Sequence, residues 1–335
     1  MTTDSEPRGT APAFSNALLQ SRVVDGTPLY KILLELVVYP THLTVDDFDW
    51  IIDLYRSVCP TDRISHFKIA ELPFWSPVAD PVLTRSARLA ASHRYVFFEA
   101  ARKRIGEGRG LEAQLWDGRE ITDSGGTFNL NIQALKRRSQ GLFWYVRFLF
   151  PLDFPAGKLV SILRTLADRL AVYSGHGGPV FAFARNKRNE AFTEIYAKAH
   201  RFWGVDIDML DRTPLRMRSR LKSPCWLNLL GSPFREDTSV AARIEEFRTT
   251  PDIFIFDQRF GTVFVLGDAP DGLDRNRLAS KVPLYQGMAK VMGGYILSGV
   301  DPLPGEGFQA NGDATDEWLQ RFSDGAGWLA PASLQ

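Results

Sequence analysis

The stretch LYKILLELVVY at residues 29–39 decides the fold class. It is almost entirely leucine, β-branched or aromatic, which is typical of a strand that is covered on both faces. Thr44 then has the character of a helix N-cap, and the acidic residues at 46 and 47 suit the positive end of a helix dipole. The sequence therefore predicts a buried strand followed directly by a helix.

Further strands follow along the chain in close succession. A helix is predicted over residues 84–105, and three strands are predicted at 111–116, 127–135 and 142–150. Strands that follow one another through short turns favour antiparallel pairing. We therefore expect an α+β fold, with a mixed or antiparallel sheet that is flanked by helices.

The strand–helix order of residues 29–105 recurs at residues 142–202. The second copy contains an amphipathic helix at 157–173 and a strand at 179–184. Residue identity between the copies is weak, so the pattern raises two pseudo-repeated strand–helix lobes as a hypothesis and leaves duplication open.

The ends of the chain differ in composition from its middle. Residues 1–24 contain few large apolar side chains and are predicted to be a flexible N-terminal arm, and residues 25–300 form one compact domain. Residues 301–335 are rich in Gly and Pro, and we expect this C-terminal tail to dock on the body. The aromatic residues expected to dock it are Trp318, Phe322 and Trp328.

The overall composition excludes several classes of protein. The 335 residues include 40 Lys+Arg and 39 Asp+Glu, and this near-neutral balance disfavours a nucleic-acid partner. With only Cys59 and Cys225, a disulfide framework is not expected and a reducing compartment fits best. The start of the chain is polar, and Glu35 and Arg147 interrupt the most apolar stretches. We therefore expect no export signal and no membrane partner, and we predict a cytoplasmic location.

The short signatures of catalysis and cofactor binding are absent. The sequence contains no G-x-S-x-G, H-E-x-x-H, P-loop, G-x-G-x-x-G or C-x-x-C motif, and its 5 histidines share no metal-ligand spacing. We therefore predict that the protein is not an enzyme and has no catalytic residue, cofactor or metal site. An enzyme with a motif-free active site between the two lobes is the alternative.

A cluster of small residues, SGHGG at 174–178, lies between a predicted helix and a predicted strand. A phosphate-binding loop needs the opposite order, with the helix after the glycines. The cluster is therefore interpreted as a glycine C-cap that ends the helix at Tyr173, with a site at His176 as the alternative.

Two charge patterns lie side by side in the third quarter of the chain. In an extended segment, alternate basic residues would line one face, either as a solvated edge strand, as a protein interface or as a nucleic-acid contact. Acidic residues just upstream are either solvated loop charges or a patch for a basic partner. The basic set is Arg216, Arg218, Arg220 and Lys222, and the acidic set is Asp206, Asp208 and Asp211.

Three blocks, read together, resemble the type VI secretion immunity family. They are YSGHGGPVF at 173–181, LKSPCWLNLLG at 221–231, and GTVFVLGDAPDGLDRNR at 261–277 followed by Tyr285. The second block matches the family's W-L-[NT]-x-L pattern, whereas Leu273 splits the Gly-Asp pair that the family shows after its later strand. The resemblance covers most of residues 28–298. The apolar residues of the second block that we expect to be buried are Trp226, Leu227, Leu229 and Leu230.

The resemblance implies an antidote that binds and neutralises a cognate effector toxin encoded by a neighbouring gene. Such an inhibitor needs a preformed surface with complementary charge rather than catalytic groups. A cytoplasmic toxin would be a nuclease or a nucleotide-directed enzyme, and carboxylates could occlude its basic substrate groove. The partner-binding candidates are Asp206, Asp208, Asp211, Arg216, Arg218 and Arg220; the competing hypothesis is a nucleic-acid-binding regulator that uses the basic set.

Overall fold

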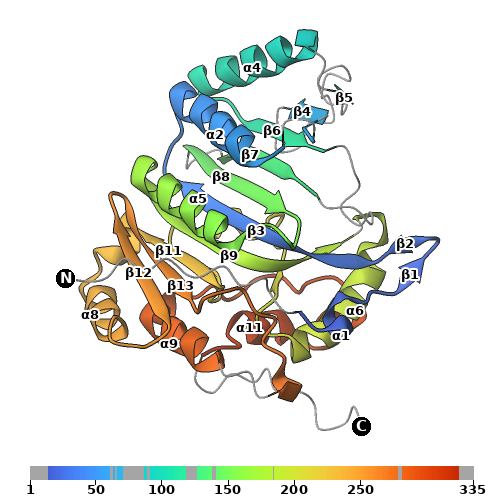
Figure 1. Ribbon diagram of the computed structural model, residues 1–335, viewed down its shortest axis with the longest axis vertical. Helices are drawn as coiled ribbons and strands as arrows, with labels where there is room; N and C mark the ends of the chain where they lie inside the picture. Colours follow the sequence, from blue (N-terminus) through green and yellow to red (C-terminus); the bar gives the residue numbers. More distant parts are fainter. Residues whose placement is uncertain are drawn as a thin grey trace.

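An eleven-stranded sheet runs through the described part of the chain and carries helices on both faces (Figure 1). The computed structural model describes residues 14–60, 63–64, 66–70, 87–88, 91–117, 127–137, 141–183, 185–277 and 281–323. The predicted α+β class, with a mixed sheet flanked by helices, is confirmed.

The α-helices are α1 (Asn16–Leu19), α2 (Val45–Val58), α4 (Ala91–Gly106), α5 (Ala156–Arg169), α6 (Arg188–Arg201), α7 (Ser232–Arg235), α8 (Thr238–Phe247), α9 (Val282–Met292), α10 (Glu306–Ala310) and α11 (Ala314–Leu319). The strands are β1 (Val23–Val24), β2 (Thr27–Pro28), β3 (Tyr30–Pro40), β4 (His66–Ala70), β5 (Ala87–Arg88), β6 (Leu111–Trp116), β7 (Asn129–Arg137), β8 (Gly141–Phe150), β9 (Val172–Phe183), β10 (Asp206–Ile207), β11 (Leu227–Gly231), β12 (Ile253–Gln258) and β13 (Gly261–Leu266). In the described residues, no helix is both long enough and apolar enough to cross a bilayer.

The sheet has the strand order β12-β13-β11-β9-β3-β8-β7-β6-β4-β5. Each neighbouring pair in this order is antiparallel, and the short β10 lies parallel to β9 beside β11. The two longest strands, β3 with 11 residues and β9 with 12, pair at the middle of the sheet. Side chains on these two strands are therefore held on the most extensively paired part of the fold.

Strand β3 separates two hydrophobic cores, as its sequence predicts. Leu34, Leu36 and Val38 pack into the core that is covered by α2, α4 and α5. Val37 and Tyr39 pack into the opposite core, together with residues of α6, α8, α9 and α11 (Figure 1). Successive side chains of a strand point to opposite faces, so Glu35 shares a face with Val37 and Tyr39.

Helix α2 begins where the sequence predicts. The Thr44 hydroxyl accepts a hydrogen bond from the Asp47 backbone N–H at 3.1 Å, and the Asp47 carboxylate accepts one from the Thr44 N–H at 3.1 Å. This reciprocal capping box satisfies two backbone donors that the first turn of a helix leaves unpaired.

The two halves of the sheet arrange their strands differently. One half has the order β3-β8-β7-β6-β4. In it, β3, which comes first in the chain, pairs with β8, which comes last. The other half has the order β9-β11-β13-β12. The strand–helix repetition in the sequence therefore does not correspond to one shared strand order, and the pseudo-repeat stays a hypothesis.

Both ends of the described chain contribute to the body. Residues 14–24 were expected to belong to the flexible arm, but they form α1 and β1, and Leu18 is fully buried. At the other end, the side chains of Trp318 and Phe322 are buried in the core beneath the sheet. Trp328 lies outside the described residues.

The glycine cluster at 174–178 is not a helix cap, so that prediction is wrong. Helix α5 ends at a C-cap leucine, Leu170, and the glycines lie inside β9. A Cβ on Gly175 would lie 2.8 Å from the Val37 carbonyl oxygen, and one on Gly177 would lie 2.9 Å from the Glu35 carbonyl oxygen. Glycine is needed here because the backbones of β9 and β3 approach closely, which is one of the few reasons for glycine within a strand.

We expect Gly177→Ala to lower the free energy of unfolding by about 1–3 kcal/mol, because the added methyl group meets backbone of β3. The control is Gly157→Ala in α5, where the new Cβ meets nothing within 4 Å. That change should be neutral or stabilise by up to about 1 kcal/mol. Urea denaturation measures both, and equal effects of the two changes would contradict the close-approach explanation.

Candidate functional site

The central strands gather charged side chains on one face of the sheet. Val37 of β3 pairs with Arg147 of β8 on one side and with His176 of β9 on the other. Because Glu35 is two residues from Val37, its side chain points to the same face as Arg147 and His176. The segment after α6 closes over this face. We call the six residues gathered there the buried charge cluster: Glu35, Arg147, His176, Asp206, Asp208 and Lys222.

Two ion-paired groups make up most of this cluster. Arg147 contacts two carboxylates, with Nε 2.5 Å from Glu35 Oε1 and Nη2 2.9 Å from Asp208 Oδ2. Lys222 Nζ lies 2.5 Å from Asp206 Oδ2 and donates to the Ile207 carbonyl oxygen at 2.9 Å. All members except Asp208 are at most 5% exposed. The cluster is therefore part of the interior and is not a surface for a macromolecular partner.

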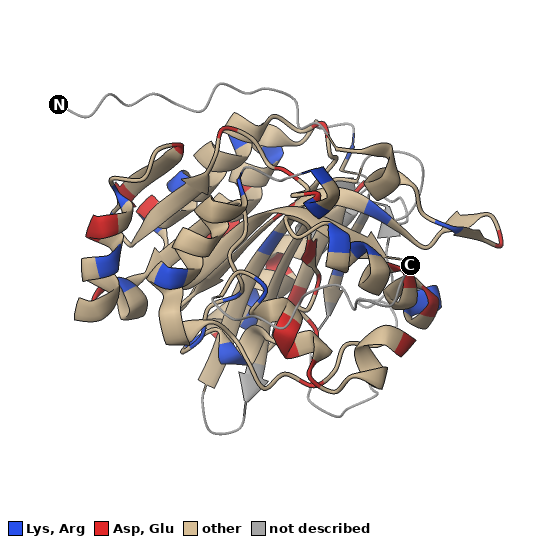
Figure 2. Ribbon diagram, turned by 90° about the horizontal axis from the view of Figure 1, so that it is seen from below, with Lys and Arg blue, Asp and Glu red and all other residues tan. Residues whose placement is uncertain are grey.

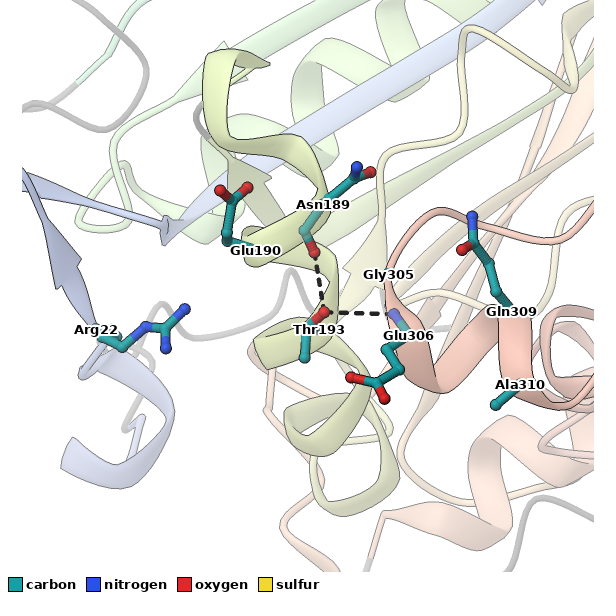
Figure 3. A pocket seen from close by; sticks show the side chains of 8 residues that line it. All are labelled: Arg22, Asn189, Glu190, Thr193, Gly305, Glu306, Gln309 and Ala310. Carbon is teal, nitrogen blue, oxygen red and sulfur yellow. Dashed lines mark hydrogen bonds between the residues drawn. The ribbon is translucent and has the colours of Figure 1, made fainter.

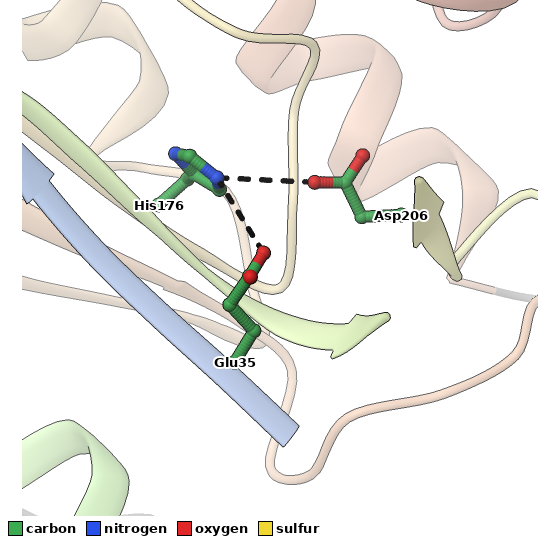
Figure 4. Close-up of side chains that lie close together, drawn as sticks. All are labelled: Glu35, His176 and Asp206. Atoms are coloured by element: carbon green, nitrogen blue, oxygen red, sulfur yellow. Dashed lines mark ion pairs between the residues drawn. The ribbon is translucent and has the colours of Figure 1, made fainter. Parts of the chain in front are cut away.

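His176 lies between two carboxylates without bonding to either of them. Its Nε2 is 3.9 Å from Glu35 Oε2 and 3.9 Å from Asp206 Oδ2 (Figure 4). Neither ring nitrogen has a hydrogen-bond partner among the described residues, and the ring stacks on Tyr39. Burial, together with the nearby cations Lys222 and Arg147, lowers the pKa of His176 well below its usual range. The imidazole is therefore neutral in the folded protein.

Arg147 and Lys222 already neutralise the carboxylates that a metal ion would bind. Ligand atoms of Glu35, His176 and Asp206 lie within 4.8 Å of one another, which by itself would allow a divalent cation. However, the Lys222 ammonium group contacts the Asp206 oxygen, and the Arg147 guanidinium contacts Glu35. A metal would have to displace a buried ammonium group, so the arrangement fits an internal ion-pair network better than a metal centre.

Catalysis on a substrate does not fit this interior either. The cavity beside His176 and Lys222 measures about 10 Å³, which is room for about one water molecule. Ser174 and Asn228 also line it. The alternative hypothesis from the sequence was an active site without a known motif between the two lobes. Such a site would need a cavity that admits a substrate, and the cavity beside His176 is too small for one.

The charge balance of the cluster explains an unusual carboxylic acid. Three carboxylates share two cations, and His176 is neutral. Burial raises the pKa of Glu35 to about 7, Arg147 and Lys222 oppose the rise, and Asp208 and Asp206 add to it. Burial also acts to lower the pKa of Lys222, but attraction to Asp206 and Glu35 outweighs it and the pKa is raised. Glu35 is therefore the group that binds a proton near neutral pH.

This assignment gives a pH-dependent stability with a defined sign. Because the folded pKa of Glu35, about 7, lies above its ordinary value of 4.5, the folded state holds the proton more tightly. Its contribution to stability is complete below pH 4.5 and is lost as the pH rises through 7. We expect the unfolding free energy of Glu35→Gln, relative to the natural protein, to rise by about 2–4 kcal/mol across that window.

Urea denaturation of both proteins at several pH values tests this expectation. The difference between the two proteins isolates Glu35, because other groups, including His176, titrate in both proteins and largely cancel. A difference that stays constant with pH would contradict the raised pKa.

The predicted acidic patch does not form one surface. Asp206 is 4% exposed and bound to Lys222, and Asp208 is bound to Arg147. Only the carboxylate of Asp211 is exposed, and it pairs with Arg188 at the start of α6 at 2.5 Å. Two of the three carboxylates therefore point into the protein, and the set does not form one patch.

The expected extended basic ladder is wrong. Pro214–Arg216 is a 3-10 helical turn, and the following residues turn rather than extend. Arg216 donates to the Ser298 carbonyl oxygen at 3.0 Å, Arg218 to that of Leu142 at 2.8 Å and Arg220 to that of Gly294 at 2.7 Å. With Lys222 buried, the four basic residues tie one loop to different parts of the fold and do not line a single face.

The surface instead offers a groove of about 570 Å³ between α6 and α10. The exposed face of α6 forms one wall, and the first and last residues of α10 form the other (Figure 3). In the described part of the chain, as seen in Figure 2, basic and acidic residues are interspersed rather than separated into large fields. We call this groove the α6 groove; its lining residues are Arg22, Asn189, Glu190, Thr193, Gly305, Glu306, Gln309 and Ala310.

Comparisons with known proteins agree with the resemblance in the sequence. The profile of the family TsiV, described as type VI immunity for VRR-NUC, matches residues 97–322. No curated protein matches this chain. Among solved structures, the Pseudomonas aeruginosa T6SS protein PA0821 is similar, with a TM-score of 0.69 and 16% identity, over 92% of this chain and 87% of that chain.

The structural likeness to PA0821 concerns the fold, whereas the family profile identifies the chain from its sequence. The profile begins later than the resemblance noted at residues 28–298 and extends past it, to include α10 and α11. Since the match covers well over half of the 335 residues, this chain belongs to the TsiV family of type VI immunity proteins.

Proposed function

We propose that this protein neutralises a VRR-NUC toxin by binding it, without catalysis. The observation that carries the proposal is the TsiV family match over residues 97–322, because the family is described as immunity for VRR-NUC. Binding alone can inhibit an enzyme when the interface buries roughly 800 Å² or more on each partner.

The interior of the protein supports a non-catalytic role. The residues with the chemistry of an active site, Glu35, His176 and Asp206, are buried and lie beside cations of the same chain. The cavity next to His176 holds about one water molecule. In this arrangement the titratable groups stabilise the sheet and have no path to a toxin.

The charges available to a partner are those that remain at the surface. Of the three predicted acidic contacts, Asp211 keeps its carboxylate exposed. Arg216 and Arg220 are exposed as well, while they donate to backbone carbonyls. We propose these three residues as contacts with the toxin and assign Asp206 and Asp208 to the stability of the fold.

The meeting place that we propose is the cytoplasm. A nuclease attacks nucleic acid, so an antidote protects the cell by holding the toxin where that substrate is found. We further propose that the toxin is encoded by a neighbouring gene, because a cell that makes the toxin needs its antidote at the same time.

Co-production in a bacterial host tests the proposal. The product of the neighbouring gene, made in the cytoplasm, should stop growth and degrade nucleic acid, and this chain should restore growth and co-purify with that product. Failure to co-purify, or protection that persists when binding is lost, would contradict neutralisation by binding.

A further inference from the structure

We propose that the α6 groove receives a cationic segment of the toxin, with Glu190 and Glu306 holding a lysine or arginine side chain. This inference rests on the proposed function and assigns it a surface. The groove has a volume of about 570 Å³, enough to accommodate side chains of a partner loop.

The groove is built on firmly packed elements. Gly305 lies so close to α6 that a Cβ there would be 2.7 Å from the Phe192 carbonyl carbon. The Thr193 hydroxyl donates to the Asn189 carbonyl oxygen at 3.0 Å and accepts from the Glu306 N–H at 3.4 Å (Figure 3). Below them, the buried ring of Phe308 packs against α6. A preformed groove lowers the entropy cost of binding.

The carboxylates of Glu190 in α6 and Glu306 in α10 differ from the paired charges at the two ends of α6. Arg188 pairs with Asp211 and Arg201 pairs with Asp274. By contrast, Glu190 and Glu306 are exposed, and among the described residues neither carboxylate has an ion pair or a hydrogen bond. Each is therefore available as an acceptor for a cation from outside the chain.

A nuclease provides such cations. Proteins that bind nucleic acid contact its phosphates through lysine and arginine side chains. These side chains have aliphatic stems, which can lie along Ala310 and Gly305, and charged ends that carboxylates bind strongly. An acidic groove also steers a basic partner during its approach.

Arg22 provides a test of whether the occupant of the groove is positively or negatively charged. Its side chain also lines the groove, on the other side of α6 from α10 (Figure 3). Its backbone N–H donates to both oxygens of Glu194 at 3.1 Å. If the occupant is cationic, Arg22 repels it, and Arg22→Gln should strengthen binding. If the occupant is anionic, the same change should weaken binding.

The experiment measures association of the full chain with the purified product of the neighbouring gene, by surface plasmon resonance at low and high salt. For the double variant Glu190→Gln, Glu306→Gln we expect an association rate constant at low salt lower by roughly tenfold, and a weaker salt dependence. Arg22→Gln should raise the same constant by about twofold to threefold.

The matched control removes two exposed carboxylates elsewhere. Glu246→Gln in α8 with Asp153→Asn before α5 keeps the same net charge as the groove variant, and neither carboxylate has a side-chain partner in the described structure. Thermal melting of every variant checks that the fold is retained.

The outcomes separate the groove from the function. If the groove variant and the control bind alike, or if Arg22→Gln weakens binding, the groove proposal is overturned while neutralisation by binding stands. If the unaltered chain does not bind the toxin, the proposed function itself fails.

Discussion

Replacing Arg147 with methionine is expected to lower the free energy of unfolding by about 3–5 kcal/mol. Arg147 is 5% exposed and contacts the carboxylates of both Glu35 and Asp208. Methionine keeps much of the length of the side chain but removes the charge, so two carboxylates remain in the interior without their guanidinium partner. Urea denaturation at a pH above 7, where Glu35 is ionised, measures the full effect.

Two further variants show whether the loss is electrostatic. Arg147→Lys keeps a positive charge but cannot bridge two carboxylates with a planar fork, so its loss should be smaller. Adding Glu35→Gln to Arg147→Met should recover part of the stability, because one uncompensated carboxylate is removed. A loss below about 1 kcal/mol for Arg147→Met would contradict a structural role for the cluster.

Trp226→Ala should also cost about 3–5 kcal/mol, for a different reason. Trp226, Leu227, Leu229 and Leu230 are all fully buried, which confirms the prediction from sequence. The indole packs in the core beneath α5, and its N–H donates to the Gly267 carbonyl oxygen at 3.3 Å. Alanine leaves a cavity there and an unpaired carbonyl group.

The control for this change is a tryptophan that is only partly buried. Trp50 of α2 stacks beneath the Arg169 guanidinium at 4.8 Å and lies at the edge of the same core. Trp50→Ala should cost about 1 kcal/mol, mainly the cation–π contact and some apolar burial. Equal losses at both positions in thermal and urea denaturation would contradict the packing explanation for Trp226.

Strands could be predicted from the sequence where nearly every residue is apolar. The strands at 29–39 and 142–150 are nearly continuous apolar stretches, and they match β3 and β8 within one residue; the strand predicted at 111–116 matches β6. The glycine-rich start of β9 could not be recognised, because glycine disfavours strands in isolation. Its reason for being there is the close approach of β3, which is a tertiary contact that local sequence does not encode.

The buried charge cluster could not be predicted from the sequence alone. Glu35 and Arg147 were visible as single charges inside two apolar strands, and a charge in a strand buried on both faces indicates a buried partner. The register that pairs β3 with β8 was needed to bring them together. The alternate basic residues at 216–222 predict an extended segment, whereas the chain turns there and buries Lys222. The acidic residues upstream predict surface charges, whereas Asp206 is buried.

The most direct test of neutralisation by binding is a titration of toxin activity. Increasing amounts of this chain are added to a fixed amount of the purified product of the neighbouring gene, and cleavage of nucleic acid, the activity proposed for that product, is measured after equilibration. We predict that activity falls in proportion to the added chain and reaches zero at an equimolar ratio. Full cleavage in large excess of the chain, or progressive loss of activity with far less than an equimolar amount, would contradict neutralisation by stoichiometric binding.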